Sequence, residues 1–134
     1  MAEAMFNALA EDRGLGFRAE SAGVRALKGE PMAPNARVVL EEMGIYAQDH
    51  RARQASEKML EGDVLVLAME QRHVAMLRRA FGDAFEVHTL PSYVNSGSGE
   101  EGVADPYGST MTAYRTSARQ LLEYVDLLLD RLEK

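Results

Sequence analysis

The sequence feature that most constrains the fold is one unbroken apolar run, Val64-Leu65-Val66-Leu67-Ala68-Met69. Because it is apolar throughout, it predicts a strand buried on both faces, as in a parallel sheet. An amphipathic helix is predicted next, at about 70–81, and a second strand at 85–90 is stopped by Pro91. A strand, a helix and a strand in this order favour a parallel sheet with crossover helices.

The remaining segments continue this alternation and predict an α/β fold with helices on both faces of the sheet. The other expected elements are a helix at about 1–10 that stops at Gly14, a short strand at 16–20, a helix from Pro34 to Gly44, a short helix at 57–60 capped by Ser56, and a final helix at 110–132. The apolar stripe of the final helix comprises Tyr114, Ala118, Leu121, Leu122, Val125 and Leu128. Nothing before Ala2 supplies an N-cap or a strand, which is unusual for a complete α/β domain.

Composition narrows the classes of function. The 134 residues predict one domain, and the net charge of −6 without a cluster of Lys and Arg argues against nucleic-acid binding. No apolar run approaches the ~20 residues of a membrane span, and no secretory signal is present, so we expect a cytoplasmic protein. Cysteine is absent, and His50, His73 and His88 lack metal-ligand spacing. We therefore expect no disulfide, no metal, no cofactor and no thiol nucleophile within these residues.

The segment Val103-Ala104-Asp105-Pro106-Tyr107-Gly108 has two interpretations. Asp, Pro and Gly are typical of a surface turn that precedes a helix. Alternatively, Asp-Pro fixes a bend that aims a carboxylate beside the ring of Tyr107, which is how a site could present a proton donor to an aromatic leaving group.

Five segments in order, 1–6, 21–23, 50–54, 63–69 and 105–108, resemble the low-molecular-weight protein tyrosine phosphatase family, of bacterial type. The resemblance implies a three-layer fold around a four-stranded parallel sheet of order 2-1-3-4, in one phosphatase-like domain covering 1–134. It also implies hydrolysis of a phosphorylated protein side chain through a cysteinyl-phosphate intermediate.

The family's first strand and its phosphate loop, Cys-x-x-x-x-x-Arg-Ser-Pro, directly precede the residues that match 1–6. We therefore expect an N-terminally incomplete domain that lacks the nucleophile and is inactive as a 134-residue polypeptide. The expected strands at 16–20 and 64–69 lose their shared neighbour. They should then pair directly, accept a rearranged N-terminus, or take a strand from another chain, which allows self-association through the vacated strand position.

The resemblance also implies roles for individual residues. Asp105 matches the general acid and base, while Tyr107 and Leu27 match the walls of the substrate cleft. Ser21 and His50 match residues that brace the phosphate loop through hydrogen bonds; apart from the resemblance, they are interpreted as a turn former and a surface histidine. For Arg51 and Arg53 we expect a structural role, because the family's phosphate-binding arginine lies in the absent loop.

Two questions stay open at the level of the sequence. Phosphotyrosine and phosphoarginine are both candidate substrates, since the tail from Tyr93 through the Asp105 motif resembles bacterial members that act on phosphoarginine. The alternative function is a non-catalytic pseudo-phosphatase or binding module, which retains the scaffold without the chemistry.

Overall fold

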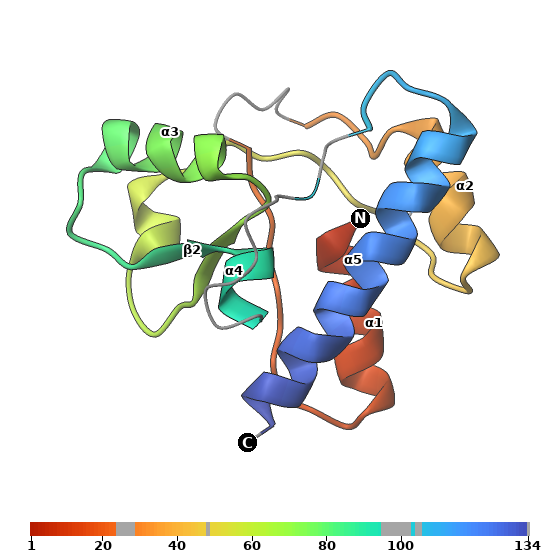
Figure 1. The fold of residues 1–134 in the computed structure, drawn as a ribbon, viewed down its shortest axis with the longest axis horizontal. Helices are drawn as coiled ribbons and strands as arrows, with labels where there is room; N and C mark the ends of the chain where they lie inside the picture. Colours follow the sequence, from red (N-terminus) through yellow and green to blue (C-terminus); the bar gives the residue numbers. More distant parts are fainter. Residues whose placement is uncertain (24–28, 48, 95–102, 104–105, 134) are drawn as a thin grey trace.

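The computed structural model describes residues 1–23, 29–47, 49–94, 103 and 106–133, and Figure 1 shows its ribbon. In chain order its elements are α1 (Ala2–Asp12), α2 (Pro34–Glu42), the 3-10 helix η1 (Glu57–Leu60), β1 (Val66–Ala68), α3 (Gln71–Phe81), β2 (Val87–Thr89), α4 (Leu90–Val94) and α5 (Met111–Leu132). None of the helices in these described ranges is long and apolar enough to span a bilayer.

The predicted strand–helix–strand unit is confirmed. Strands β1 and β2 pair in parallel, with Val66 opposite Val87 and Ala68 opposite Thr89. Helix α3 connects the two strands, and both α3 and α4 pack against them. The class is therefore α/β, with a small parallel sheet. Strand β2 is shorter than expected because Leu90 and Pro91 begin α4, where proline is tolerated in the first turn of a helix.

Two predictions about strands are wrong: the strand expected at 16–20, and the length and burial of the strand expected at 64–69. Among the described residues the sheet has two strands, and the segment 16–22 pairs with neither of them. Residues 64 and 65 precede β1 and are uncovered, with Val64 50% and Leu65 41% exposed, although burial on both faces was expected. The reason is that, within the described part of the chain, β1 has a neighbouring strand on one edge only, which leaves the residues that lead into it uncovered.

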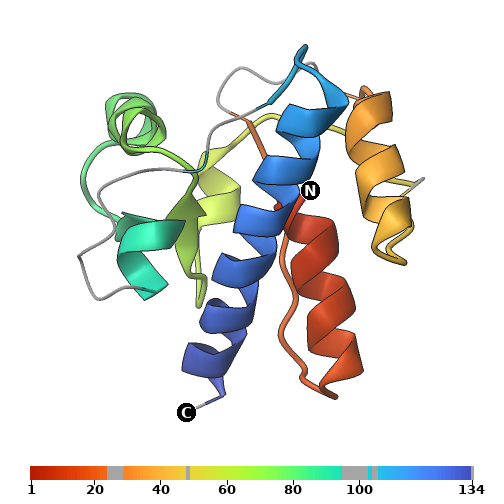
Figure 2. The same ribbon diagram turned by 45° about the vertical axis from the view of Figure 1, so that its right-hand side comes forward.

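The segment 16–22 instead follows α1. In both views it lies between α1 and the sheet and runs in the same direction as β1 (Figures 1 and 2). A side chain of α1, and not strand pairing, holds this segment in place. The side-chain amide of Asn7 accepts from the Ala19 N–H at 2.8 Å and donates to the Ala19 carbonyl at 3.1 Å.

Most of the hydrophobic core lies between helices rather than against the sheet. Helix α5 packs against α1, α2 and α4. The buried side chains of α5 include Tyr114, Ala118, Leu121, Val125, Leu128 and Leu129. The stripe predicted for this helix is thus confirmed, apart from Leu122, which is half-buried. Met5 and Phe6 of α1 and Leu40 of α2 supply the facing surface.

The predicted helix ends are mostly confirmed. Gly14 and Gly44 follow α1 and α2 with φ of +70° and +78°, the left-handed conformation that glycine adopts without steric cost. Thr110 caps α5, where its hydroxyl accepts from the Ala113 N–H at 3.2 Å. Ser56 precedes η1, but its side chain makes no capping hydrogen bond, so that part of the prediction is wrong.

Candidate functional site

The carboxylate of Glu3, in the first turn of α1, is the centre of a polar cluster. One oxygen, Oε1, accepts from the Ser21 N–H at 2.7 Å and from the Ser21 Oγ at 2.9 Å. The same oxygen lies 3.2 Å from Nη2 of Arg53, and Oε2 lies 3.4 Å from Nδ1 of His50. The side chains of Glu3 and His50 are each 17% exposed. Three separate segments of the chain therefore meet at the start of one helix.

Backbone hydrogen bonds hold the segment that carries His50 and Arg53 in place. The Gly23 N–H donates to the Arg53 carbonyl at 2.9 Å, and the Ala55 N–H donates to the Gly23 carbonyl at 2.8 Å. On the other side, Ala52 exchanges hydrogen bonds with residues 29 and 30 at 2.8 and 2.7 Å. The positions of His50 and Arg53 are thus fixed by backbone hydrogen bonds as well as by their own side-chain contacts.

The surroundings of Glu3 favour its charged form. Partial burial on its own would raise the pKa of this carboxyl. The hydrogen bonds from the hydroxyl and backbone N–H of Ser21, together with the adjacent His50, outweigh burial and hold the pKa of Glu3 below its ordinary value. A carboxylate in the first turn also interacts favourably with the helix dipole.

The start of α1 has no side-chain cap. Its N-cap position is Met1, which makes no side-chain capping bond. The first N–H groups of a helix have no intrahelical partner and favour an anion, such as a phosphate group. The Glu3 cluster lies directly beside these donors, and its partners fix Ser21 and His50 relative to them. The cluster is therefore suited to positioning a loop at the helix start.

The structure brings two of the predicted site residues together. Ser21 and His50, predicted to brace one loop, share the Glu3 carboxylate. Tyr107 is 69% exposed and lies in a turn closed by the Ser109 N–H donating to the Pro106 carbonyl at 2.8 Å. Asp105 and Leu27 lie outside the described residues.

Val103, two residues before Asp105, is anchored at the sheet. Val103 is 2% exposed, and its N–H donates to the carbonyl of Met69 at 2.7 Å. Because Met69 directly follows β1, this bond ties Val103 to the carboxyl end of the strand. Ligands of open parallel sheets bind at that end of the strands.

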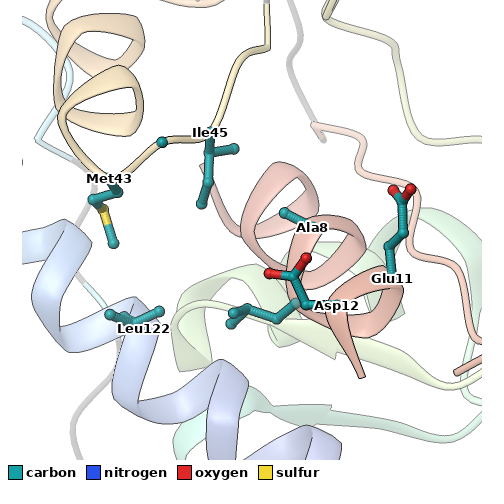
Figure 3. Close-up of a pocket in the computed structure, with 8 residues that line it drawn as sticks. Ala8, Glu11, Asp12, Met43, Ile45 and Leu122 are labelled. Carbon is teal, nitrogen blue, oxygen red and sulfur yellow. The ribbon is translucent and has the colours of Figure 1, made fainter. Parts of the chain in front are cut away.

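A shallow depression elsewhere on the molecule does not coincide with this cluster. It has a volume of about 480 Å³ and is lined by Ala8, Leu9, Glu11, Asp12, Met43, Gly44, Ile45 and Leu122. Figure 3 shows it between the second half of α1, the end of α2 and α5, with the carboxylates of Glu11 and Asp12 at its border. None of the predicted site residues lines it. Two carboxylates are poorly suited to a phosphorylated ligand, because like charges repel.

The sequence interpretation overlooked the role of Glu3. This residue was part of a matching segment, but no function was assigned to it. A signal was available, since an acidic residue in the first turn of an uncapped helix is favourably placed for bonds with neighbouring donors. Arg53 has the structural role expected of it, and it also approaches Glu20, with Nη1 3.9 Å from Oε1. Within the described ranges, no group of three or more acidic, His or Cys side chains could hold a metal ion.

Comparison with known proteins gives matches over the whole chain. Residues 1–134 match the family model described as Low molecular weight phosphotyrosine protein phosphatase. A protein-arginine-phosphatase of Bacillus subtilis is 35% identical over 135 residues, which cover 100% of this chain and 88% of the relative.

Two solved structures are also similar. A low molecular weight protein tyrosine phosphatase from T. tengcongensis has a TM-score of 0.90 and 36% identity, covering 97% of this chain and 88% of that one. A Cys-to-Ser mutant of an arginine phosphatase, with a phosphorylated active-site serine, has a TM-score of 0.92 and 32% identity, covering 99% and 86%.

Proposed function

The chain belongs to the low molecular weight phosphotyrosine protein phosphatase family, and we propose from this that it forms the scaffold of a hydrolase for phosphorylated protein side chains. The nucleophile and the phosphate-binding arginine would come from a strand and loop outside these 134 residues, since the chain contains no cysteine. In that scaffold the strand lies at the centre of a four-stranded sheet of order 2-1-3-4. The 134-residue polypeptide alone is expected to be inactive.

The observation that carries this proposal is the convergence of Ser21, His50 and Arg53 on Glu3 at the start of α1. A phosphate-binding loop needs its backbone N–H groups fixed in an inward-pointing arrangement before the substrate arrives. Ser21 and His50 are held beside the helix start by a common carboxylate, which is the preorganisation that such a loop requires. The first turn of α1, which has no side-chain cap, is the end of the helix that favours an anion.

The chemistry would proceed in two displacements. In the first, a thiolate attacks phosphorus, an S–P bond forms, and the bond from phosphorus to the substrate oxygen or nitrogen breaks. Asp105 donates the proton that the leaving atom acquires. In the second, Asp105 takes a proton from water as the water oxygen attacks phosphorus. The S–P bond then breaks and releases inorganic phosphate.

In the same proposal, Tyr107 and Leu27 form the walls of the substrate cleft. The exposure of Tyr107 supports this role, because an aromatic residue that is 69% exposed can lie against the substrate's side chain. The substrate class is phosphotyrosine or phosphoarginine. Similarity to the Bacillus subtilis protein-arginine-phosphatase over the full chain favours phosphoarginine.

An assay with an aryl phosphate tests the proposal. The 134-residue polypeptide is compared with the same polypeptide extended at its N-terminus by the strand and nucleophilic loop of the Bacillus subtilis relative. We expect no turnover above background from the first protein and clear turnover from the second. A Cys-to-Ser change in the added loop is the matched control and should abolish the turnover.

Two results would contradict the proposal. Turnover by the unextended polypeptide that is lost on Asp105→Asn would show that it is active without a thiol. A folded but inactive extended protein would favour the alternative function, a non-catalytic binding module. If the extended protein is active, its relative rates on phosphoarginine and phosphotyrosine peptides separate the two substrate classes.

A further inference from the structure

The depression between α1, α2 and α5 lies away from the Glu3 cluster. Its lining comes from the second half of α1, from the residues that follow α2 and from Leu122 of α5. A helix rises about 1.5 Å per residue, so Glu11 and Asp12 lie about 12–14 Å from Glu3 along the axis of α1. Met1 is at the Glu3 end of this helix. The cluster and the depression therefore occupy opposite ends of α1.

The floor of the depression is apolar. Four side chains of the lining are half-buried and pack against the hydrophobic core: Leu9, Met43, Ile45 and Leu122. Figure 3 shows Met43, Ile45 and Leu122 on one side of the depression, with Ala8 of α1 on the other. Because the side chain of Ala8 ends at its Cβ, α1 leaves room at this point for an apolar side chain of a partner.

The border of the depression carries negative charge that the chain does not neutralise. Glu11 and Asp12 are exposed, and neither forms an ion pair with another residue in the described ranges. The neighbouring Arg13 does not compensate them, because its guanidinium pairs with three other carboxylates, at 3.1, 2.8 and 2.9 Å. A cationic group placed at this border would therefore meet two carboxylates that have no competing partner there.

Two helix ends add to the negative potential. Helix α1 ends at Asp12, and α2 ends one residue before Met43, so both carboxyl ends border the depression. Neither helix has a basic residue in its last turn. The carboxyl end of a helix carries a partial negative charge and favours a cation nearby. The border is thus complementary to an ammonium or guanidinium group, and the floor to an aliphatic side chain.

Tyr46 extends the apolar surface beyond the depression. It directly follows Ile45 and is 72% exposed. Aromatic side chains are enriched in protein–protein interfaces, whereas small-molecule sites are clefts that enclose most of their ligand. A shallow depression beside an exposed tyrosine therefore fits a side chain that belongs to another polypeptide.

We propose that this depression is a docking site for a basic, amphipathic segment of a partner protein. A bulky aliphatic side chain of that segment lies between Ala8 and Leu122, and flanking lysine or arginine side chains pair with Glu11 and Asp12. The buried aliphatic group supplies most of the affinity, and the charges select the partner. Docking here does not involve a nucleophile, so it can be measured on the 134-residue chain itself.

An NMR titration with a synthetic peptide tests this. The probe is a short peptide that has two leucines between pairs of lysines. Saturable shifts should centre on residues 8–12, 43–46 and Leu122. Ala8→Leu fills the depression with a residue that favours helix and should weaken binding by about tenfold or more. The double variant Glu11→Gln and Asp12→Asn should weaken binding by about three- to tenfold, and this difference should shrink at high salt.

Two controls separate a specific site from general attraction to an acidic chain. Glu61→Gln with Asp63→Asn removes the same charge from exposed positions before β1, and it should change the affinity by less than about twofold. A peptide with serine in place of both leucines keeps its charge and should bind about tenfold more weakly. Circular dichroism should show that every variant keeps its helical content.

Four results would overturn the proposal. The first is the absence of saturable shifts at the lining residues, including shifts that appear at Glu3 and Ser21 instead. The second is equal binding of the serine and leucine peptides. The third is an equal loss of affinity from the two double variants, because net charge alone would then explain binding. The fourth is a dimer of the peptide-free chain that Ala8→Leu dissociates, because the occupant would then be a second copy of this chain.

Discussion

Glu3 connects local helix chemistry to the long-range organisation of the molecule. A glutamate in the first turn of a helix is favourable on its own through the dipole. Here the same carboxylate also binds the end of 16–22 through Ser21 and the 50–55 segment through His50 and Arg53. Residues 18 and 50 positions away in sequence thus depend on one side chain.

Replacing this carboxylate should lower stability in a pH-dependent way. Glu3→Gln keeps an acceptor for Ser21 but removes the charge, so we expect a loss of about 1–2 kcal/mol in the free energy of unfolding at pH 7. The folded pKa of Glu3 lies below its unfolded value. The charge therefore contributes fully above about pH 4.3, and its contribution is lost as pH falls through the folded pKa. Urea titrations at pH 7 and below pH 4 should show the difference between the two proteins closing in acid.

Glu11→Gln is the matched control, because Glu11 lies exposed in the same helix. Its effect should stay below about 0.5 kcal/mol at either pH. A Glu3→Gln loss that is the same at both pH values would contradict the ionic account of the cluster.

Helix α5 begins shortly after the Asp105 motif, and its N-cap residue is Thr110. Thr110 closes the segment after Tyr107 by accepting from the Ala113 N–H. Thr110→Ala should cost about 1 kcal/mol in unfolding free energy, because one helix donor loses its partner. Thr116→Ala, at an exposed position inside the helix, should be neutral or slightly stabilising. Equal losses from the two variants would show that the cap contributes nothing.

Helices were predicted from the sequence more reliably than strands, and the reason is physical. A helix satisfies its backbone internally, so the apolar stripe of α5 and the glycines after α1 and α2 were sufficient signals. A strand depends on neighbours that may be distant in sequence. The run at 64–69 carries the composition of a buried strand, yet only 66–68 forms one, because pairing exists on one edge.

The candidate site was predictable only in part for a similar reason. Ser21 and His50 could be selected from short motifs, and the structure places them together. That Glu3 joins them could not be derived from spacing, because the contact depends on how α1, 16–22 and 50–55 lie in three dimensions. The roles of Asp105, Tyr107 and Leu27 remain predictions.

At the scale of the whole molecule, stability should depend on the contact of α5 with the other helices. Leu129 is fully buried in the core, whereas Leu127, in the same helix, is 44% exposed. Leu129→Ala should cost about 3–4 kcal/mol in unfolding free energy, through lost burial and the cavity left behind. Leu127→Ala should cost less than about 1 kcal/mol. Similar losses at both positions in urea titrations would contradict a core built around α5.

The central claim is that this scaffold places Asp105 as the proton donor of a phosphatase. The most direct measurement uses the N-terminally extended protein and compares Asp105→Asn with the unchanged residue on two substrates, phenyl phosphate and 4-nitrophenyl phosphate. Phenolate is a more basic leaving group than 4-nitrophenolate, so its departure depends more strongly on a proton from Asp105. Because Asp105 also acts in the second displacement, which is the same for both substrates, the comparison is made on kcat/KM, which reports the first displacement. The account predicts that kcat/KM falls by about 10²–10⁴ on phenyl phosphate and distinctly less on 4-nitrophenyl phosphate. An equal fall on both substrates, or no fall on either, would contradict it.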